Sequence, residues 1–134
     1  MNSENTSKII NACPSIFSHI EDELNNMEKG KPFLPIAFYF ECGDGWCDLL
    51  VDLCMKIQIH LFSMSENDAK QIKVDQVKEK YGTLRFYMNS YDEKIESYIR
   101  EAEIRSANTC EVCGMFGEVR GDGWLYCSCE NHVR

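Results

Sequence analysis

The clearest pattern of apolar and polar positions predicts an amphipathic helix over residues 46–62. Its apolar residues recur three or four positions apart, so they line one face of a helix. They are Trp46, Leu49, Leu50, Leu53, Cys54, Ile57 and Leu61. The preceding Gly43-Asp-Gly-Trp46 segment is expected to be a turn in which Asp44 caps the helix. We expect this helix to form the centre of the core.

Two further helices are indicated by weaker patterns. Residues 14–29 begin with a proline that suits a first helical turn, and Gly30 suits the stop. A third helix is expected to begin at residue 89 or 90 and to end near residue 108. Its start matches a capping box, Ser90-x-x-Glu93, and Ile95, Ile99 and Ala102 form a narrow apolar stripe.

Three short segments have the character of strands. Residues 36–40 form an apolar, aromatic run that is typical of a buried strand. Residues 71–78 and 83–88 alternate apolar and polar side chains around a turn at 79–82, which predicts a β-hairpin. Residues 63–70 are polar and are expected to be a loop. The fold class is therefore α+β, with a small sheet of one strand and one hairpin packed on two or three helices.

The cysteine spacing near the end of the sequence predicts a metal site. Cys110-Glu-Val-Cys113-Gly114 is followed by Cys127-Ser-Cys129-Glu-Asn-His132, the ligand pattern of structural zinc. The intervening residues are long enough for a small hairpin, 116–120 and 125–127. We expect the ligands to be Cys110, Cys113, Cys129 and His132, because Cys129-x-x-His132 brackets one helical turn. Cys127 is the alternative to Cys129.

Four protein ligands fill a tetrahedral site and leave no position for water, so the expected Zn²⁺ is structural rather than catalytic. Residues 1–108 are then predicted to form an α+β domain, and residues 109–134 a zinc-knuckle or ribbon-like segment packed on it. The 134 residues suit one domain with a small appendage.

The composition of the chain also indicates the cellular compartment. No apolar run approaches the roughly 20 residues of a membrane helix, and the N-terminal residues do not resemble a signal peptide. We therefore expect a cytoplasmic protein without a membrane partner, in which clustered cysteines are metal ligands rather than disulfides. Cys13, Cys42, Cys47 and Cys54 are expected to be mostly buried thiols. A second metal site at Cys42, Cys47 and Cys54 is disfavoured by its spacing.

The charge of the chain is unevenly distributed. The net charge is −8, which opposes general binding to nucleic acid. Residues 70–88 contain five cations and two anions, a net +3, which leaves −11 for the remainder. This basic stretch fits either a docking surface or the solvated face of the hairpin, and we favour the solvated face.

Three motifs together resemble a family. They are Glu41-Cys-Gly-Asp-Gly-Trp-Cys-Asp-Leu-Leu50, Gln76-Val-Lys-Glu-Lys-Tyr-Gly-Thr-Leu-Arg-Phe-Tyr87, and Cys110-Glu-Val-Cys-Gly114 with a downstream tryptophan and Cys-x-x-His. The set resembles uncharacterised small bacterial and phage proteins with GDGW, KEKFG-LRFY and CEVCG…CxxH motifs. The resemblance implies Cys129 rather than Cys127 as ligand, and a role in phage–host conflict. It implies no particular activity, and Cys47 and Cys127 depart from its pattern.

The favoured function is a zinc-stabilised interaction protein that binds another protein, with a phage or mobile-element inhibitor of a host system as one form. The expected contact residues are Lys78, Lys80, Tyr81, Arg85 and Tyr87. The alternative is nucleic-acid binding through Phe116, Arg120, Trp124 and Tyr126. An enzyme acting through Cys42, Cys47 or Glu79 is the least favoured hypothesis, because no spacing requires it. The Gly-Asp-Gly-Trp sequence recurs at residues 121–124, which we interpret as coincidence.

Overall fold

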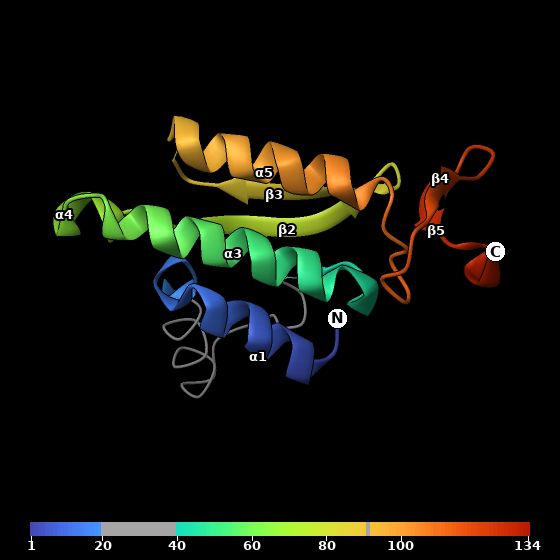
Figure 1. Ribbon diagram of the computed structural model, residues 1–134, viewed down its shortest axis with the longest axis horizontal. Coiled ribbons are helices and arrows are strands. Elements are labelled where there is room, and N and C mark those ends of the chain that lie inside the picture. The colour runs from blue at the N-terminus through green and yellow to red at the C-terminus, as the bar shows by residue number, and fades with distance from the viewer. Residues whose placement is uncertain (20–39, 91) are drawn as a thin grey trace, which may run out of the picture.

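The computed structural model describes residues 1–19, 40–90 and 92–134. Within them the chain has the predicted α+β architecture, with a small sheet packed on helices and a separate two-stranded hairpin (Figure 1). The helices are α1 (Ser3–Ala12), α3 (Cys47–Phe62), α4 (Glu66–Ala69) and α5 (Glu93–Ser106). The strands are β1 (Phe40–Glu41), β2 (Val74–Lys80), β3 (Thr83–Met88), β4 (Glu118–Arg120) and β5 (Tyr126–Ser128). Short 3-10 turns occupy Pro14–Phe17, Asp44–Trp46 and Glu130–His132.

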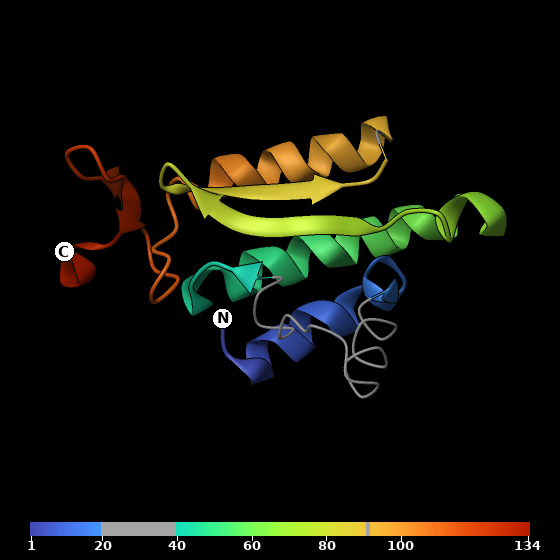
Figure 2. The same cartoon turned by 180° about the vertical axis from the view of Figure 1, so that it is seen from behind.

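Helix α3 forms the centre of the core, as its apolar stripe predicts. Leu50, Cys54 and Ile57 have no exposed surface, and both α1 and α5 pack against α3 (Figures 1 and 2). The predicted cap of this helix is wrong. The 3-10 turn Asp44–Trp46 places Asp44 three residues before the helix begins, and its carboxylate instead accepts hydrogen bonds from the backbone of Asn2 at 2.7 Å and the side chain of Asn5 at 3.0 Å. Asp44 therefore ties α1 to the turn.

Helix α1 is not predicted from the sequence. Its N-cap is Asn2, whose side chain accepts the N–H of Asn5, and only Thr6 and Ile9 are buried. Its residues are mostly polar, so the segment offers few apolar positions from which to predict a helix. Of the predicted helix 14–29, the described part is the 3-10 turn Pro14–Phe17, and residues 20–29 lie outside the described residues. The predicted strand 36–40 is described only at its last residue, which belongs to β1.

The sheet has the order β1–β2–β3, with β1 parallel and β3 antiparallel to β2. Its hairpin turn is tighter than the expected 79–82, because only Tyr81 and Gly82 lie between the strands. Both have positive φ, 54° and 82°, as a two-residue hairpin turn of type I′ requires. The core face is formed by Val74, Val77, Leu84 and Phe86. The expected loop 63–70 contains α4, which Ser65 caps by accepting the N–H of Asp68.

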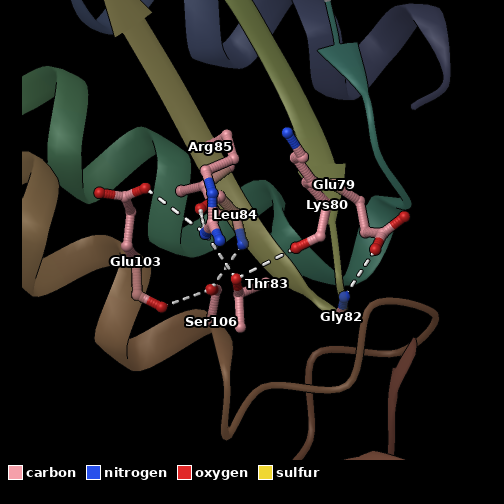
Figure 3. Close-up of polar contacts among 8 residues, drawn as sticks. All are labelled: Glu79, Lys80, Gly82, Thr83, Leu84, Arg85, Glu103 and Ser106. Carbon is pink, nitrogen blue, oxygen red and sulfur yellow. Dashed lines mark hydrogen bonds and ion pairs between the residues drawn. The ribbon is translucent and has the colours of Figure 1, made fainter. Parts of the chain in front are cut away.

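Helix α5 lies along β3, and its last turn covers part of the strand (Figure 3). The buried Ser106 hydroxyl accepts the N–H of Leu84 at 2.8 Å. The predicted capping box of α5 is wrong, because the N-cap is Asp92, whose carboxylate accepts the N–H of Ile95 at 3.0 Å. Asp92 lies directly before the helix, at the position where a carboxylate reaches the third helical N–H.

Ser106→Ala is expected to reduce the free energy of unfolding by about 1–2 kcal/mol, because it leaves the buried N–H of Leu84 without an acceptor. Urea unfolding measures the change. Ser97→Ala is a matched control on the same helix, since Ser97 contacts only the carbonyl of Lys94 one turn earlier and is partly exposed. Equal effects of the two substitutions would contradict the assigned role of Ser106.

Candidate metal centre

Four residues converge beyond the end of α5, in the segment that Figures 1 and 2 show beside the β2–β3 turn. They are Cys110, Cys113, Cys129 and His132, whose ligand atoms all lie within 4.8 Å of one another. The Sγ atoms of Cys113 and Cys129 are 3.7 Å apart. The Nδ1 atom of His132 is 3.2 Å from Cys129 Sγ and 3.6 Å from Cys110 Sγ. These are the four residues expected from the spacing.

These distances fit a tetrahedral ion. Bonds of about 2.3 Å to sulfur and 2.0 Å to nitrogen place the ligand atoms about 3.5–3.8 Å apart around such an ion. Three of the observed separations, 3.2, 3.6 and 3.7 Å, are close to these values, and all the ligand atoms lie within 4.8 Å of one another. The group is therefore close enough to hold a metal ion, with Nδ1 as the histidine ligand atom.

A tight turn orients the first two cysteines. The N–H of Gly114 donates to the carbonyl of Cys110 at 2.9 Å, and Gly114 has a φ of 82°, which favours glycine. The N–H of Cys110 donates to Met115 O at 2.7 Å. Burial raises the pKa of the Cys110 thiol, but hydrogen bonds from the backbones of Cys129, Cys113 and Val112 outweigh it and lower the pKa to about 6. Hydrogen bonds from Cys129 and from the turn thus favour the thiolate that a metal requires.

The hairpin β4–β5 returns the chain to this turn, as expected, although its strands are only three residues long. Val119 pairs with Cys127 and Arg120 with Tyr126. Cys129 follows β5 directly, and the 3-10 turn Glu130–His132 brings His132 back to the thiol of Cys129. The one-turn spacing of Cys129 and His132 is therefore realised.

Cys127, the alternative ligand, lies outside the group. It is almost fully buried in the core, and its thiol donates to the carbonyl of Ala107 at 3.4 Å. Burial raises its pKa, which opposes formation of a thiolate. Cys127 therefore packs in the core, and Cys129 is the cysteine that lies beside Cys110, Cys113 and His132.

The first Gly-Asp-Gly-Trp turn fixes the cysteine turn to the main body, which sequence reasoning missed. The N–H of Gly45 donates to Glu111 O at 2.8 Å, and the N–H of Gly43 donates to the Glu111 carboxylate at 2.8 Å. The fully buried Trp46 donates from Nε1 to Thr109 O at 2.8 Å. These three hydrogen bonds thus hold Thr109 and Glu111, the residues on either side of Cys110. The sequence contains both the Gly-Asp-Gly-Trp motif and the Cys110–Gly114 motif, but the spacing of their residues does not reveal that the two segments are in contact.

The second Gly-Asp-Gly-Trp sequence has no such role. It forms the loop between β4 and β5, which projects away from the rest of the molecule (Figures 1 and 2), and Trp124 is 78% exposed. One indole lies in the core and the other lies in solvent. The repeat therefore reflects no shared structural function, in agreement with its interpretation as coincidence.

The remaining cysteines do not form a second centre. Cys13, Cys42, Cys47 and Cys54 are all buried, as expected. Burial raises the pKa of each thiol, that of Cys42 to about 12. Among the described residues, the only group of metal-binding geometry is the one at Cys110, Cys113, Cys129 and His132. The disfavoured site at Cys42, Cys47 and Cys54 does not form there.

The expected contact residues gather on the β2–β3 hairpin. Lys78 is directly opposite Arg85. Lys80 and Tyr87 lie on the same face, Lys80 two residues nearer the turn and Tyr87 two residues farther from it. Tyr81 lies at the tip and is 68% exposed. Arg85 is less free to contact a partner than the other four residues, because its guanidinium already has contacts within the protein. Its guanidinium lies 3.7 Å from the carboxylate of Glu103 and donates to Thr83 Oγ1 at 2.6 Å (Figure 3).

Several residues expected to act in nucleic-acid binding or in catalysis are buried or make contacts within the protein. Tyr126 is buried, with the guanidinium of Arg134 4.6 Å from the centre of its ring, and Arg120 Nε donates to Ser128 O. Phe116 and Trp124 remain exposed. Glu79, one candidate of the enzyme hypothesis, accepts the N–H of Gly82 at 2.7 Å and braces the hairpin turn (Figure 3).

In the described parts of the chain, we find no helix with the length and apolar character that crossing a membrane requires. No family model, curated protein or solved structure matches this chain.

Proposed function

We propose that the chain is a zinc-stabilised interaction protein, in which Zn²⁺ at Cys110, Cys113, Cys129 and His132 is structural and the β2–β3 hairpin binds a protein with an acidic surface. The observation that carries the proposal is the closed donor set. Three thiols and one imidazole are the ligands that zinc prefers, and a fourth protein ligand leaves no open position for a substrate or water. The eight free cysteines fit a reducing compartment.

The role of the zinc follows from its surroundings. The segment that follows α5 has short strands and many exposed apolar residues, among them Met115, Phe116 and Trp124. Short strands and exposed apolar residues give the segment little stability of its own, whereas structural zinc in small modules contributes about 10–16 kcal/mol of apparent binding free energy. The Gly43–Trp46 segment anchors the turn at Cys110. The ion would join this turn to the end of β5.

The hairpin is the favoured docking surface because its charges oppose sheet stability. Like charges directly opposite each other in a sheet are destabilising, and Lys78 is opposite Arg85. Glu103 compensates Arg85, but neither Lys78 nor Lys80 forms an ion pair within the residues that the structure describes. Glu41 is the register partner of Lys78 in β1 without forming an ion pair with it. An acidic partner would relieve this repulsion, and the exposed Tyr81 would provide an aromatic anchor.

The test is affinity capture from the native cell with the zinc-loaded protein, followed by mass spectrometry. Lys78→Glu/Lys80→Glu is expected to lose the partner, because the charge of the face is reversed. Lys8→Glu/Lys70→Glu changes the net charge equally at exposed sites outside the hairpin and should retain it. A partner retained by both variants, or lost equally from both, would contradict the assignment of the hairpin. The resemblance to phage proteins favours a partner from a host system.

A further inference from the structure

The eight cysteines differ sharply in their access to solvent. Cys113 is exposed and Cys129 is partly exposed, whereas the other six are buried. Cys110 has no exposed surface although it belongs to the same metal group. A small reagent in solution therefore reaches the metal group from one side only.

The two accessible sulfurs are also neighbours. The Sγ atoms of Cys113 and Cys129 lie 3.7 Å apart, so a shift of less than 2 Å brings them to the bond length of a disulfide, about 2.05 Å. A groove of about 340 Å³ adjoins this edge and gives small molecules a path to Cys129. It is lined by Met115, Phe116, Glu118, Arg120, Cys129 and Asn131, among others.

We propose that Cys113 and Cys129 form an oxidation site that reacts with hydroperoxides and releases the metal. The inference rests on the zinc ligation proposed above, which keeps both sulfurs as thiolates, the reactive form. One thiolate attacks one oxygen of the peroxide, the O–O bond breaks, the sulfur becomes a sulfenic acid, and the other oxygen leaves as hydroxide. The second thiolate attacks the sulfenic sulfur, a disulfide forms, and a second hydroxide leaves.

The step balances as two thiolates, one hydrogen peroxide and two protons giving one disulfide and two waters. Two of the four metal ligands are lost, so one Zn²⁺ is released for each disulfide formed. The bonds from the Gly43 and Gly45 backbones to Glu111 do not involve these sulfurs, so the turn at Cys110 stays attached to the main body. The oxidised protein is expected to keep its core and to lose the metal.

The experiment begins with zinc content, measured before any oxidant is added. The zinc-loaded protein is then titrated with hydrogen peroxide, and released Zn²⁺ is followed with a metallochromic dye. Disulfides are mapped by mass spectrometry after cleavage at Glu111 and Arg120, which separates Cys110 from Cys113. We expect one zinc released per disulfide, and the disulfide to join Cys113 to Cys129. Added zinc and a phosphine reductant should restore the starting state.

The outcomes are distinguishable. Protein without zinc at the start would refute the proposed ligation itself. Full zinc at the start, followed by release with a disulfide to Cys110 or with no disulfide, would overturn the oxidation site while leaving the ligation intact. After cleavage at Arg120, Cys127 lies on the same peptide as Cys129. Cys127→Ser removes this second thiol and should change neither the release of zinc nor the Cys113–Cys129 disulfide. Limited alkylation of the zinc-loaded protein gives an independent measurement, in which labelling of Cys110 before Cys113 would contradict the assigned order of access.

Discussion

Gly45→Ala is expected to destabilise the protein by about 3 kcal/mol, the upper end of the cost of overpacking a filled site. A Cβ at this position would lie 2.1 Å from the carbonyl oxygen of Cys110 and 2.6 Å from the carbonyl carbon of Glu111. Both are backbone atoms of the turn that carries the first metal ligand, so neither can move aside as a side chain would. The substitution should also separate the Cys110 turn from the Asp44–Trp46 turn and weaken zinc binding. Urea unfolding and a competitive zinc titration measure the two effects.

Gly123→Ala is the matched control. Gly123 lies in the projecting β4–β5 loop, where a Cβ would meet nothing within 4 Å, and its only constraint is a φ of 89°. Its cost is therefore that of a left-handed residue, about 1 kcal/mol, without an effect on zinc affinity. If Gly45→Ala were no more destabilising than Gly123→Ala, the contact between the Cys110 turn and the Asp44–Trp46 turn would not have the assigned role.

Cys110→Ser is expected to reduce zinc affinity by more than about 100-fold, since even the loss of a residue that only supports a ligand costs roughly 10–100-fold. Cys110 is the buried member of the group, and hydrogen bonds from the backbones of Cys129, Cys113 and Val112 lower its pKa to about 6. Without the ion, the β4–β5 hairpin and the residues that follow it should lose protection from hydrogen exchange, whereas α3 should keep it. Elemental analysis and hydrogen-exchange mass spectrometry provide the two readouts.

Cys127→Ser distinguishes ligation from packing. Serine keeps a donor for the carbonyl of Ala107, so this variant is expected to bind a full equivalent of zinc. A full zinc equivalent in Cys110→Ser, or substoichiometric zinc in Cys127→Ser, would mean that the ligand set is wrong.

The elements that the sequence predicts are those with strong local patterns. The apolar stripe of α3 and the alternation of apolar and polar residues around Tyr81-Gly82 each indicate which face is buried. Helix α3 and the β2–β3 hairpin therefore lie close to their expected positions in the sequence. Helix α1 escapes prediction because it buries only Thr6 and Ile9, and its place depends on contacts such as that between Asn2 and Asp44. The errors at the starts of α3 and α5 have a related cause, since several residues near a helix start are able to cap it and tertiary contacts select among them.

The candidate site was predictable for a different reason. Metal ligands must be cysteine or histidine at spacings that allow convergence, so Cys110, Cys113, Cys129 and His132 stand out in a single sequence. Nothing of this kind marks the partners of Glu111, because backbone N–H groups of Gly43 and Gly45 leave no chemical signature. The glycines are informative only once the structure shows what a Cβ would meet.

The central claim is that one zinc ion is held by three sulfurs and one nitrogen in a closed site. X-ray absorption at the zinc edge of the purified, zinc-loaded protein tests it directly. The account predicts one zinc per chain with three sulfurs at about 2.3 Å and one nitrogen at about 2.0 Å. Two sulfurs with two or more light atoms, or an additional water ligand, would contradict it.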